Sequence, residues 1–236
     1  MSLTIMRHSL RLDFVEDSTW DDKFTRPYDT PVRCLELPSV QGKKLKQHNI
    51  TKVIVSPFRR CLQTAAVVCR EIGVKEIIVD RNIGETMTAV RYCNNKVNPH
   101  LEQSEHTFEY LSEEESVATV KCINPDLHLQ SIIGGKPSYD ETAEASRERF
   151  HKTAFEYIHN IHQTNSNSGD GQLDNLLFIA HGDVVQTLGG SLTRNDIYCV
   201  NECGFVVVDA SKAVAEAREY TQHVFPLKHF DNVEMM

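Results

Sequence analysis

Residues 53–73 read VIVSPFRRCLQTAAVVCREIG, a short apolar run followed by a stretch with helical periodicity. The run 53–55 has the length and composition of a strand buried in a parallel sheet. Beyond it, apolar side chains recur at i, i+3 and i+4, on one face of a helix. They are Leu62, Ala65, Ala66, Cys69 and Ile72. Ser56 is a suitable N-cap, Pro57 suits the first helical position and Gly73 suits the end, so the stretch predicts a strand followed by a helix.

The same alternation continues along the chain. Four more short apolar runs are bounded by polar residues: Leu3–Met6, Ile77–Val79, Leu176–Ala180 and Phe205–Val208. A second helical stripe runs from Asp140 to Ile161. Strands that alternate with helices predict a mostly parallel central sheet with helices on both faces. We therefore expect an α/β fold with three layers, α/β/α.

The chain has 236 residues, of which 40% are hydrophobic and 25% are charged, as is usual for a globular protein. This length favours a single domain spanning residues 1–236. The net charge of −8 disfavours binding to nucleic acid, and no apolar run is long enough to cross a membrane. Seven cysteines without a C-x-x-C pair suggest a reduced chain, so we expect a cytoplasmic protein.

Three segments fit the alternating pattern poorly. Residues 90–139 contain the acidic run Glu113–Glu115, and we interpret them as an insertion that covers the site and contributes to substrate selection. Residues 13–37, which hold the single tryptophan, are a second candidate for a covering loop. The polar segment 163–172 is expected to be a surface linker.

Polar side chains follow four of the predicted strands. Arg7 and His8 follow the first, residues 56–60 the second, Glu85 lies just beyond the third, and His181 follows the fourth. Because the carboxyl ends of parallel strands meet at one edge of a sheet, these groups are expected to converge there.

Two histidines and several arginines at one edge indicate a site for an oxyanion. Arginine presents paired N–H donors that match phosphate oxygens, and a helix N-terminus adds a favourable dipole. Positive neighbours lower the pKa of a histidine, which then stays neutral and can attack phosphorus. Glu85 is available to protonate the departing oxygen. The residues thus suggest phosphoryl transfer through histidine.

Three motifs carry a resemblance to a known family. They are TIMRHSLRLD at 4–13, SPFRRCLQTA at 56–65 and LLFIAHGD at 176–183. Together and in this order they resemble the histidine phosphatase superfamily, in its phosphoglycerate mutase-like branch. The spacing of Arg7, His8, Arg11 and Asp13 is similar to that of the Sts-type (suppressor of T-cell receptor signalling) and ecdysteroid phosphate phosphatases.

The resemblance implies a phosphoglycerate mutase-like fold and a role for each matching residue. His8 would be the phosphorylated nucleophile and Glu85 the proton donor. Arg7, Arg60 and His181 would bind the phosphate, with Arg11 as a further clamp. No metal or organic cofactor is implied. Read alone, Arg11 could instead pair with Asp13, and Arg59 competes with Arg60 for the pocket.

The sequence departs from the family pattern in places. Ser9 stands where the family's first motif has glycine, so a Cβ and a hydroxyl enter a tight turn. Leu10 replaces the glutamate of the Sts-type motif, and the family's P-L-T-x-x-G stretch is altered to PSVQG at 38–42.

We expect a hydrolase: a metal-independent phosphomonoesterase that forms phosphohistidine. Two alternatives stay open, a mutase of the phosphoglycerate type and a phosphate-binding regulatory module with little turnover, which Ser9 favours. The expected partner is a phosphorylated small molecule or a phosphoprotein. The oligomeric state stays open, a homodimer being one possibility.

Overall fold

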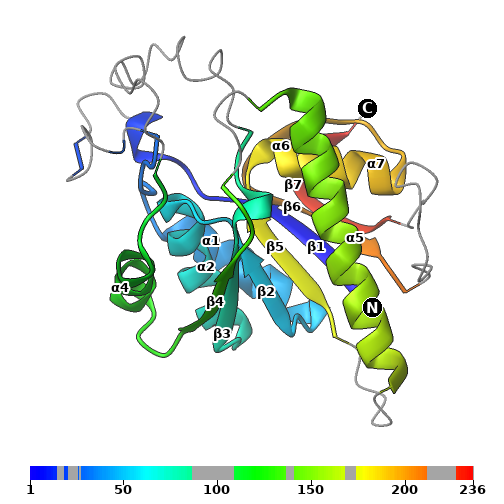
Figure 1. Ribbon diagram of the computed structural model, residues 1–236, viewed down its shortest axis with the longest axis horizontal. Coiled ribbons are helices and arrows are strands. Elements are labelled where there is room, and N and C mark those ends of the chain that lie inside the picture. The colour runs from blue at the N-terminus through cyan, green and yellow to red at the C-terminus, as the bar shows by residue number, and fades with distance from the viewer. Residues whose placement is uncertain are drawn as a thin grey trace.

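The computed structural model describes residues 1–14, 19–20, 26, 28–86, 109–136, 141–167, 174–211 and 227–235. Strands and helices in this part of the chain form three layers around one central sheet (Figure 1).

The sheet has seven strands in the order β4-β3-β2-β5-β1-β6-β7. Five are mutually parallel: β1 (Ser2–Arg7), β2 (Lys52–Val55), β3 (Glu76–Asp80), β4 (His128–Ile133) and β5 (Leu176–Ala180). Two antiparallel strands, β6 (Ile197–Asp209) and β7 (Leu227–Met235), extend the sheet beyond β1. The predicted mostly parallel α/β fold is confirmed.

Helices cover both faces of this sheet (Figure 1). One face carries α1 (Glu36–Leu45), α2 (Arg59–Ile72) and α4 (Glu113–Ile123). The other carries α5 (Ala143–Asn167), α6 (Gly182–Val184), the π-helical turn η5 (Val185–Gly189) and α7 (Gly190–Thr193). Short 3-10 turns are η1 (Leu12–Phe14), η2 (Lys46–His48) and η3 (Arg81–Ile83).

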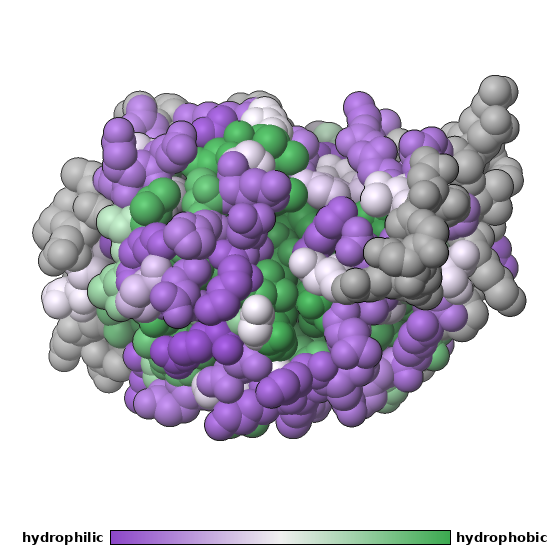
Figure 2. Space-filling view, turned by 90° about the horizontal axis from the view of Figure 1, so that it is seen from below, coloured by the Kyte–Doolittle hydropathy of each residue, from purple (hydrophilic) through white to green (hydrophobic). Residues whose placement is uncertain are grey.

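Two apolar cores hold the layers together, one on each face of the sheet. The first surrounds Leu62 and Val79, and the second surrounds Phe150 and Phe178. The central strand β5 is buried along its whole length and contributes to both, which explains its unbroken apolar sequence. From below, apolar side chains gather in a central stripe between hydrophilic ones (Figure 2). No helix in the described ranges is long and apolar enough to cross a membrane.

Part of the predicted covering insertion belongs to the fold itself. Within 90–139, the acidic run forms the first turn of α4, which begins with a capping box between Ser112 and Glu115. The chain then forms β4, an edge strand paired with β3. Residues 87–108 lie outside the described residues. In the segment 13–37, residues 15–18, 21–25 and 27 also lie outside them.

Two predicted helix boundaries are wrong. Helix α2 begins at Arg59 with Phe58 as N-cap, so Ser56 does not cap it, whereas Gly73 ends it with φ 84° as expected. Helix α5 continues to Asn167 and includes the first residues of the predicted 163–172 linker. Residues 168–173 lie outside the described part of the chain.

Candidate active site

The carboxyl ends of four strands bring the predicted site residues together. His8 follows β1, Arg60 lies in the first turn of α2 after β2, and His181 follows β5. Glu85 follows β3 after the turn η3. All four are buried, with exposed fractions of 3% for His8, 0% for Arg60, 1% for His181 and 7% for Glu85.

Backbone hydrogen bonds continue beyond the strand ends and fix these loops against each other. The His8 N–H donates to the Ala180 carbonyl at 2.9 Å, and the Ser56 N–H donates to the Ile179 carbonyl at 3.0 Å. The carbonyl of His8 accepts from the Cys203 N–H at 3.1 Å. The peptide that carries His8 is thus fixed on both sides.

His8 is held as a neutral ring with a defined tautomer. Its Nδ1 lies 2.6 Å from the Ser9 carbonyl oxygen, which can only accept, so Nδ1 carries the proton. Burial lowers the pKa of His8 well below its ordinary value, and the charges of Arg60, His181 and Arg7 lower it further. The neutral ring therefore has its lone pair on Nε2.

Arg60 is the central cation of the cluster. Its Nη2 donates to the carboxylate of Glu85 and lies 3.3 Å from Nδ1 of His181, while its Nη1 donates to the Tyr28 carbonyl at 3.0 Å. The guanidinium also stacks on Phe58, 4.4 Å from the ring centroid. Arg60 thus joins Glu85 to His181.

His181 lies beside His8, with ring centroids 5.3 Å apart in an edge-on arrangement. Because arginine can only donate, Nδ1 of His181 accepts from Arg60. The ring proton of the neutral form then lies on Nε2, which is 2.8 Å from Oγ of Ser56. Nδ1 is also 3.8 Å from the Glu85 carboxylate, so the two groups are neighbours across Arg60.

Arg7 and Arg11 have other partners. Arg7 donates to the Val200 carbonyl and lies 3.4 Å from the carboxylate of Glu202, with its charge close enough to lower the pKa of His8. Arg11 makes two hydrogen bonds to Asp13, at 2.9 and 2.5 Å. The alternative pairing of Arg11 with Asp13 is therefore present, and the phosphate clamp at Arg11 stays a prediction.

Ser9 fits the turn after β1 without strain. It is not among the described residues with positive φ, so a glycine is not required for the backbone there. Its N–H donates to Oγ1 of Thr64 at 3.0 Å, and its Oγ donates to the Cys34 carbonyl at 3.5 Å. The serine is fully buried.

The sequence did not reveal the role of Asp29. This side chain is 2% exposed, and its Oδ1 accepts from the Arg59 N–H at 2.7 Å. Asp29 therefore caps the first turn of α2, the turn that carries Arg60, and that N–H is not available to a phosphate. Burial raises the pKa of Asp29 to about 6, although the charge of Arg60 opposes the shift. The only feature of the sequence that could have pointed to Asp29 is its position in the run D-T-P at 29–31.

Ser56 was expected at the site edge for a different reason. The sequence suggested a helix cap, but its hydroxyl instead contacts His181.

No group of three or more His, Cys, Asp or Glu residues within the described ranges is arranged to hold a metal ion.

Comparison with solved structures shows the same fold in known phosphatases. The ecdysone phosphate phosphatase of Bombyx mori aligns with a TM-score of 0.60 and 15% identity, covering 88% of both chains. A mycobacterial glucosyl-3-phosphoglycerate phosphatase aligns with a TM-score of 0.53 and 13% identity, covering 96% of both chains. At these identities the likeness concerns the fold. No curated protein matches the sequence.

A family model also matches the chain directly. The model of the histidine phosphatase superfamily (branch 1) matches residues 40–98, which include α2 and Arg60 as well as Glu85. The matched segment thus holds two of the four buried site residues, and the fold places them beside His8 and His181. The match covers about a quarter of the chain, so over residues 40–98 the chain is similar to the histidine phosphatase superfamily, and the solved structures add a shared fold.

Proposed function

We propose that the chain is a metal-independent phosphomonoesterase in which His8 carries the phosphoryl group. The observation that supports this most strongly is the 2.6 Å contact of His8 Nδ1 with the Ser9 carbonyl, which leaves Nε2 as the nucleophile, while burial and the neighbouring charges lower the pKa of the ring. The phosphatase names of the structural neighbours support the same reaction class.

In the first step, the Nε2 lone pair of His8 forms a bond to phosphorus while the bond from phosphorus to the ester oxygen breaks. The departing oxygen takes a proton from the carboxyl group of Glu85. Arg60 and His181 stabilise the charge on the remaining phosphate oxygens, with Arg7 contributing its field. The products are phosphohistidine, a free alcohol or phenol, and a Glu85 carboxylate.

Arg60 links phosphate binding to the proton on Glu85. Without a ligand, Arg60 is paired with the Glu85 carboxylate, which favours the ionised form. A phosphate dianion competes for the same guanidinium. When Arg60 turns to the phosphate, Glu85 loses this ion pair and gains a neighbouring negative charge, so its proton affinity rises. Glu85 therefore takes up a proton from the solvent as the substrate binds, and becomes the acid of the first step.

In the second step, water attacks the phosphohistidine. The Glu85 carboxylate accepts a proton from this water, the bond between Nε2 and phosphorus breaks, and His8 recovers its lone pair. Inorganic phosphate leaves, Glu85 releases its proton to the solvent, and the carboxylate pairs with Arg60 again. The substrate class is a phosphate monoester, on either a small molecule or a protein.

The test is hydrolysis of p-nitrophenyl phosphate in the presence of EDTA. The wild-type chain is expected to turn over, and His8→Ala is expected to lose turnover because no other group replaces the nucleophile. His128→Ala is the matched control, since His128 is an exposed histidine at the start of β4. Equal turnover in His8→Ala and wild type would contradict the proposal.

A phosphate-binding module is the second candidate. It is favoured by the burial of His8 and by the engagement of Arg60 with Glu85, both of which limit turnover in this conformation. A wild-type chain that binds inorganic phosphate by calorimetry but hydrolyses no aryl phosphate would support this role over the esterase.

A further inference from the structure

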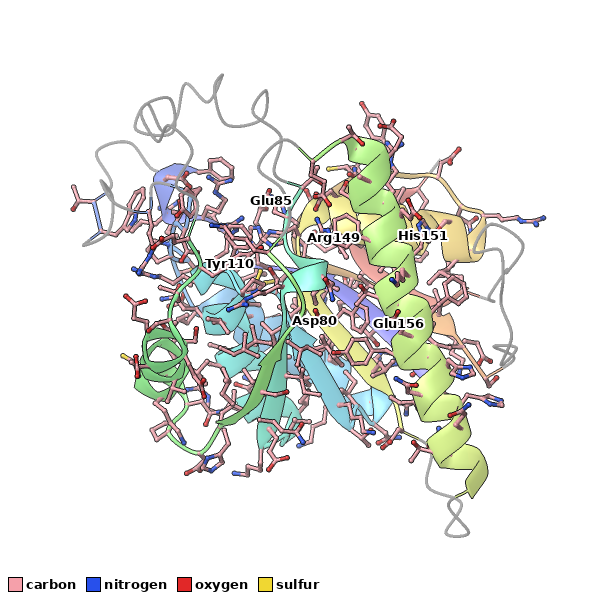
Figure 3. All side chains as sticks on the ribbon, in the orientation of Figure 1. Asp80, Glu85, Tyr110, Arg149, His151 and Glu156 are labelled. Atoms are coloured by element: carbon pink, nitrogen blue, oxygen red, sulfur yellow. The ribbon has the colours of Figure 1, made fainter. Side chains whose placement is uncertain are left out.

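Arg149 of α5 contacts the segment that carries Glu85. Its Nη1 donates to two backbone carbonyls, of Asn82 at 2.6 Å and of Gly84 at 3.1 Å. The Gly84 carbonyl belongs to the peptide group that joins Gly84 to Glu85, so this contact is on the backbone of the proposed acid itself. Figure 3 shows Arg149 on α5, close to Asp80 and Glu85.

Arg149 is itself held by a two-point ion pair. Its Nε donates to Oε1 of Glu141 at 2.8 Å, and its Nη2 donates to Oε2 at 2.6 Å. The side chains are only 14% and 7% exposed, respectively, which limits screening by water and salt. A planar guanidinium held at both ends of the fork has one orientation, and in this orientation its remaining nitrogen meets the two carbonyls.

The other side of Glu85 is fastened as well. The N–H and hydroxyl of Thr86 donate to Oδ2 of Asp183, at 3.1 and 2.7 Å. Asp183 lies two residues after His181. The backbone on both sides of Glu85 is thus hydrogen-bonded to the helical layer that contains α5 and α6. Gly84 is held by α5, and Thr86 is held by α6.

We propose that Arg149, oriented by Glu141, is a positioning residue that sets the place of the Glu85 carboxyl against His8 and Arg60. This rests on the proposed function, because it assigns Arg149 to the proton-transfer part of that reaction. Proton transfer needs the acid within hydrogen-bond reach of the leaving oxygen, so a displacement of about 1 Å costs much of the rate. Arg149 does not touch the phosphate in this scheme.

The first test uses aryl phosphates with different leaving groups. A poor leaving group, as in phenyl phosphate, needs the proton from Glu85, whereas a good one, as in 2,4-dinitrophenyl phosphate, departs with little help. Arg149→Met is expected to lower kcat on phenyl phosphate by about 10²-fold or more, and to change it far less on the dinitrophenyl ester. Glu85→Gln is expected to show the same pattern.

Equal losses on both esters would overturn the proposal, since a merely structural defect harms both reactions alike. Arg149→Lys keeps the charge but cannot serve Glu141 and both carbonyls at once, so we expect a partial recovery on phenyl phosphate. Arg147→Met, an exposed arginine on the same helix, is the matched control and should retain wild-type values on both esters.

The second test does not depend on activity. The ¹³C carboxyl resonance of Glu85, assigned by its loss in Glu85→Gln, reports the surroundings of that carboxyl. It is expected to shift in Arg149→Met and, by less, in Arg149→Lys, and to stay in place in Arg147→Met. An unshifted resonance in both Arg149 variants overturns the positioning role. A wild-type chain that hydrolyses no aryl phosphate refutes the proposed function instead, and the resonance still decides the role of Arg149.

Discussion

His8 combines a fixed tautomer with a depressed pKa, and the two have separate causes. The Ser9 carbonyl holds the proton on Nδ1, while burial and the charges of Arg60, His181 and Arg7 oppose a second proton. A backbone acceptor favours the cation slightly, but the desolvation cost is larger. The ring thus remains a nucleophile where an ordinary histidine would be charged.

This state predicts the acid side of the pH profile. The folded-state pKa of His8 is lowered, so the neutral form persists as the pH falls through 6.5, the ordinary value, and is lost only well below it. We expect the acid limb of kcat/KM, measured on p-nitrophenyl phosphate, to lie below pH 6.5. Arg7→Met should move this limb to higher pH, because it removes a charge that opposes protonation. A limb at or above 6.5 in the wild type would show that His8 is not shielded in this way.

Ser9 predicts a result opposite to what its place in the family motif suggests. Because its φ is not in the left-handed region, Ser9→Gly relieves no strain, and it gives the unfolded chain more freedom. We expect the variant to be less stable by about 0.5–1 kcal/mol, with turnover not raised. Thermal unfolding and p-nitrophenyl phosphate kinetics check both parts. A large gain in kcat would mean that the hydroxyl obstructs the phosphate.

Among the elements, α2 is the helix that was predicted most completely from the sequence, and it also carries Arg60 of the site. Its apolar stripe packs into the first core, and its first turn places Arg60. The predicted cap was wrong because the acceptor for the first N–H comes from Asp29, 30 residues earlier in the chain. Local sequence cannot reveal such a cap.

The packing of α1 on α2 depends on a glycine. A Cβ at Gly42 would lie 2.9 Å from Cβ of Glu71 and 3.3 Å from Cα of Val68, and both residues belong to α2. Gly42→Ala must therefore push the helices apart, and we expect a loss of about 1–3 kcal/mol in the free energy of unfolding by urea. Val40→Ala, at a half-exposed position of the same helix, is the control and should cost much less. Equal losses would mean that the contact at Gly42 is not tight.

The edge strands show why part of the fold could not be predicted. The strands with unbroken apolar runs, such as β5, are buried on both faces and were recognised. The edge strands β4 and β7 have sequences HLQSII and LKHFDNVEM, in which polar residues interrupt the apolar ones because much of each strand is exposed. Their assignment to the sheet comes only from pairing with β3 and β6.

At the scale of the whole molecule, the site is assembled from segments far apart in the sequence. The rule that parallel strands place their following loops at one edge was sufficient to bring His8, Arg60, Glu85 and His181 together. The rule could not reveal the contacts that hold these side chains. Arg60 donates to the backbone carbonyl of Tyr28, and Arg149, on a helix of the other face, donates to the backbone carbonyl of Gly84. Contacts of this kind leave no local pattern in the sequence.

The account depends on one covalent state, the phosphorylated His8. The most direct measurement is to mix the chain with p-nitrophenyl phosphate, quench within milliseconds in alkali, and map the modified peptide by mass spectrometry. We predict a phosphate on the peptide that contains His8, stable in alkali, lost in acid, and absent from His8→Ala. An active chain with phosphate on another residue, or with no phosphoenzyme while His8→Ala retains full turnover, would contradict the account.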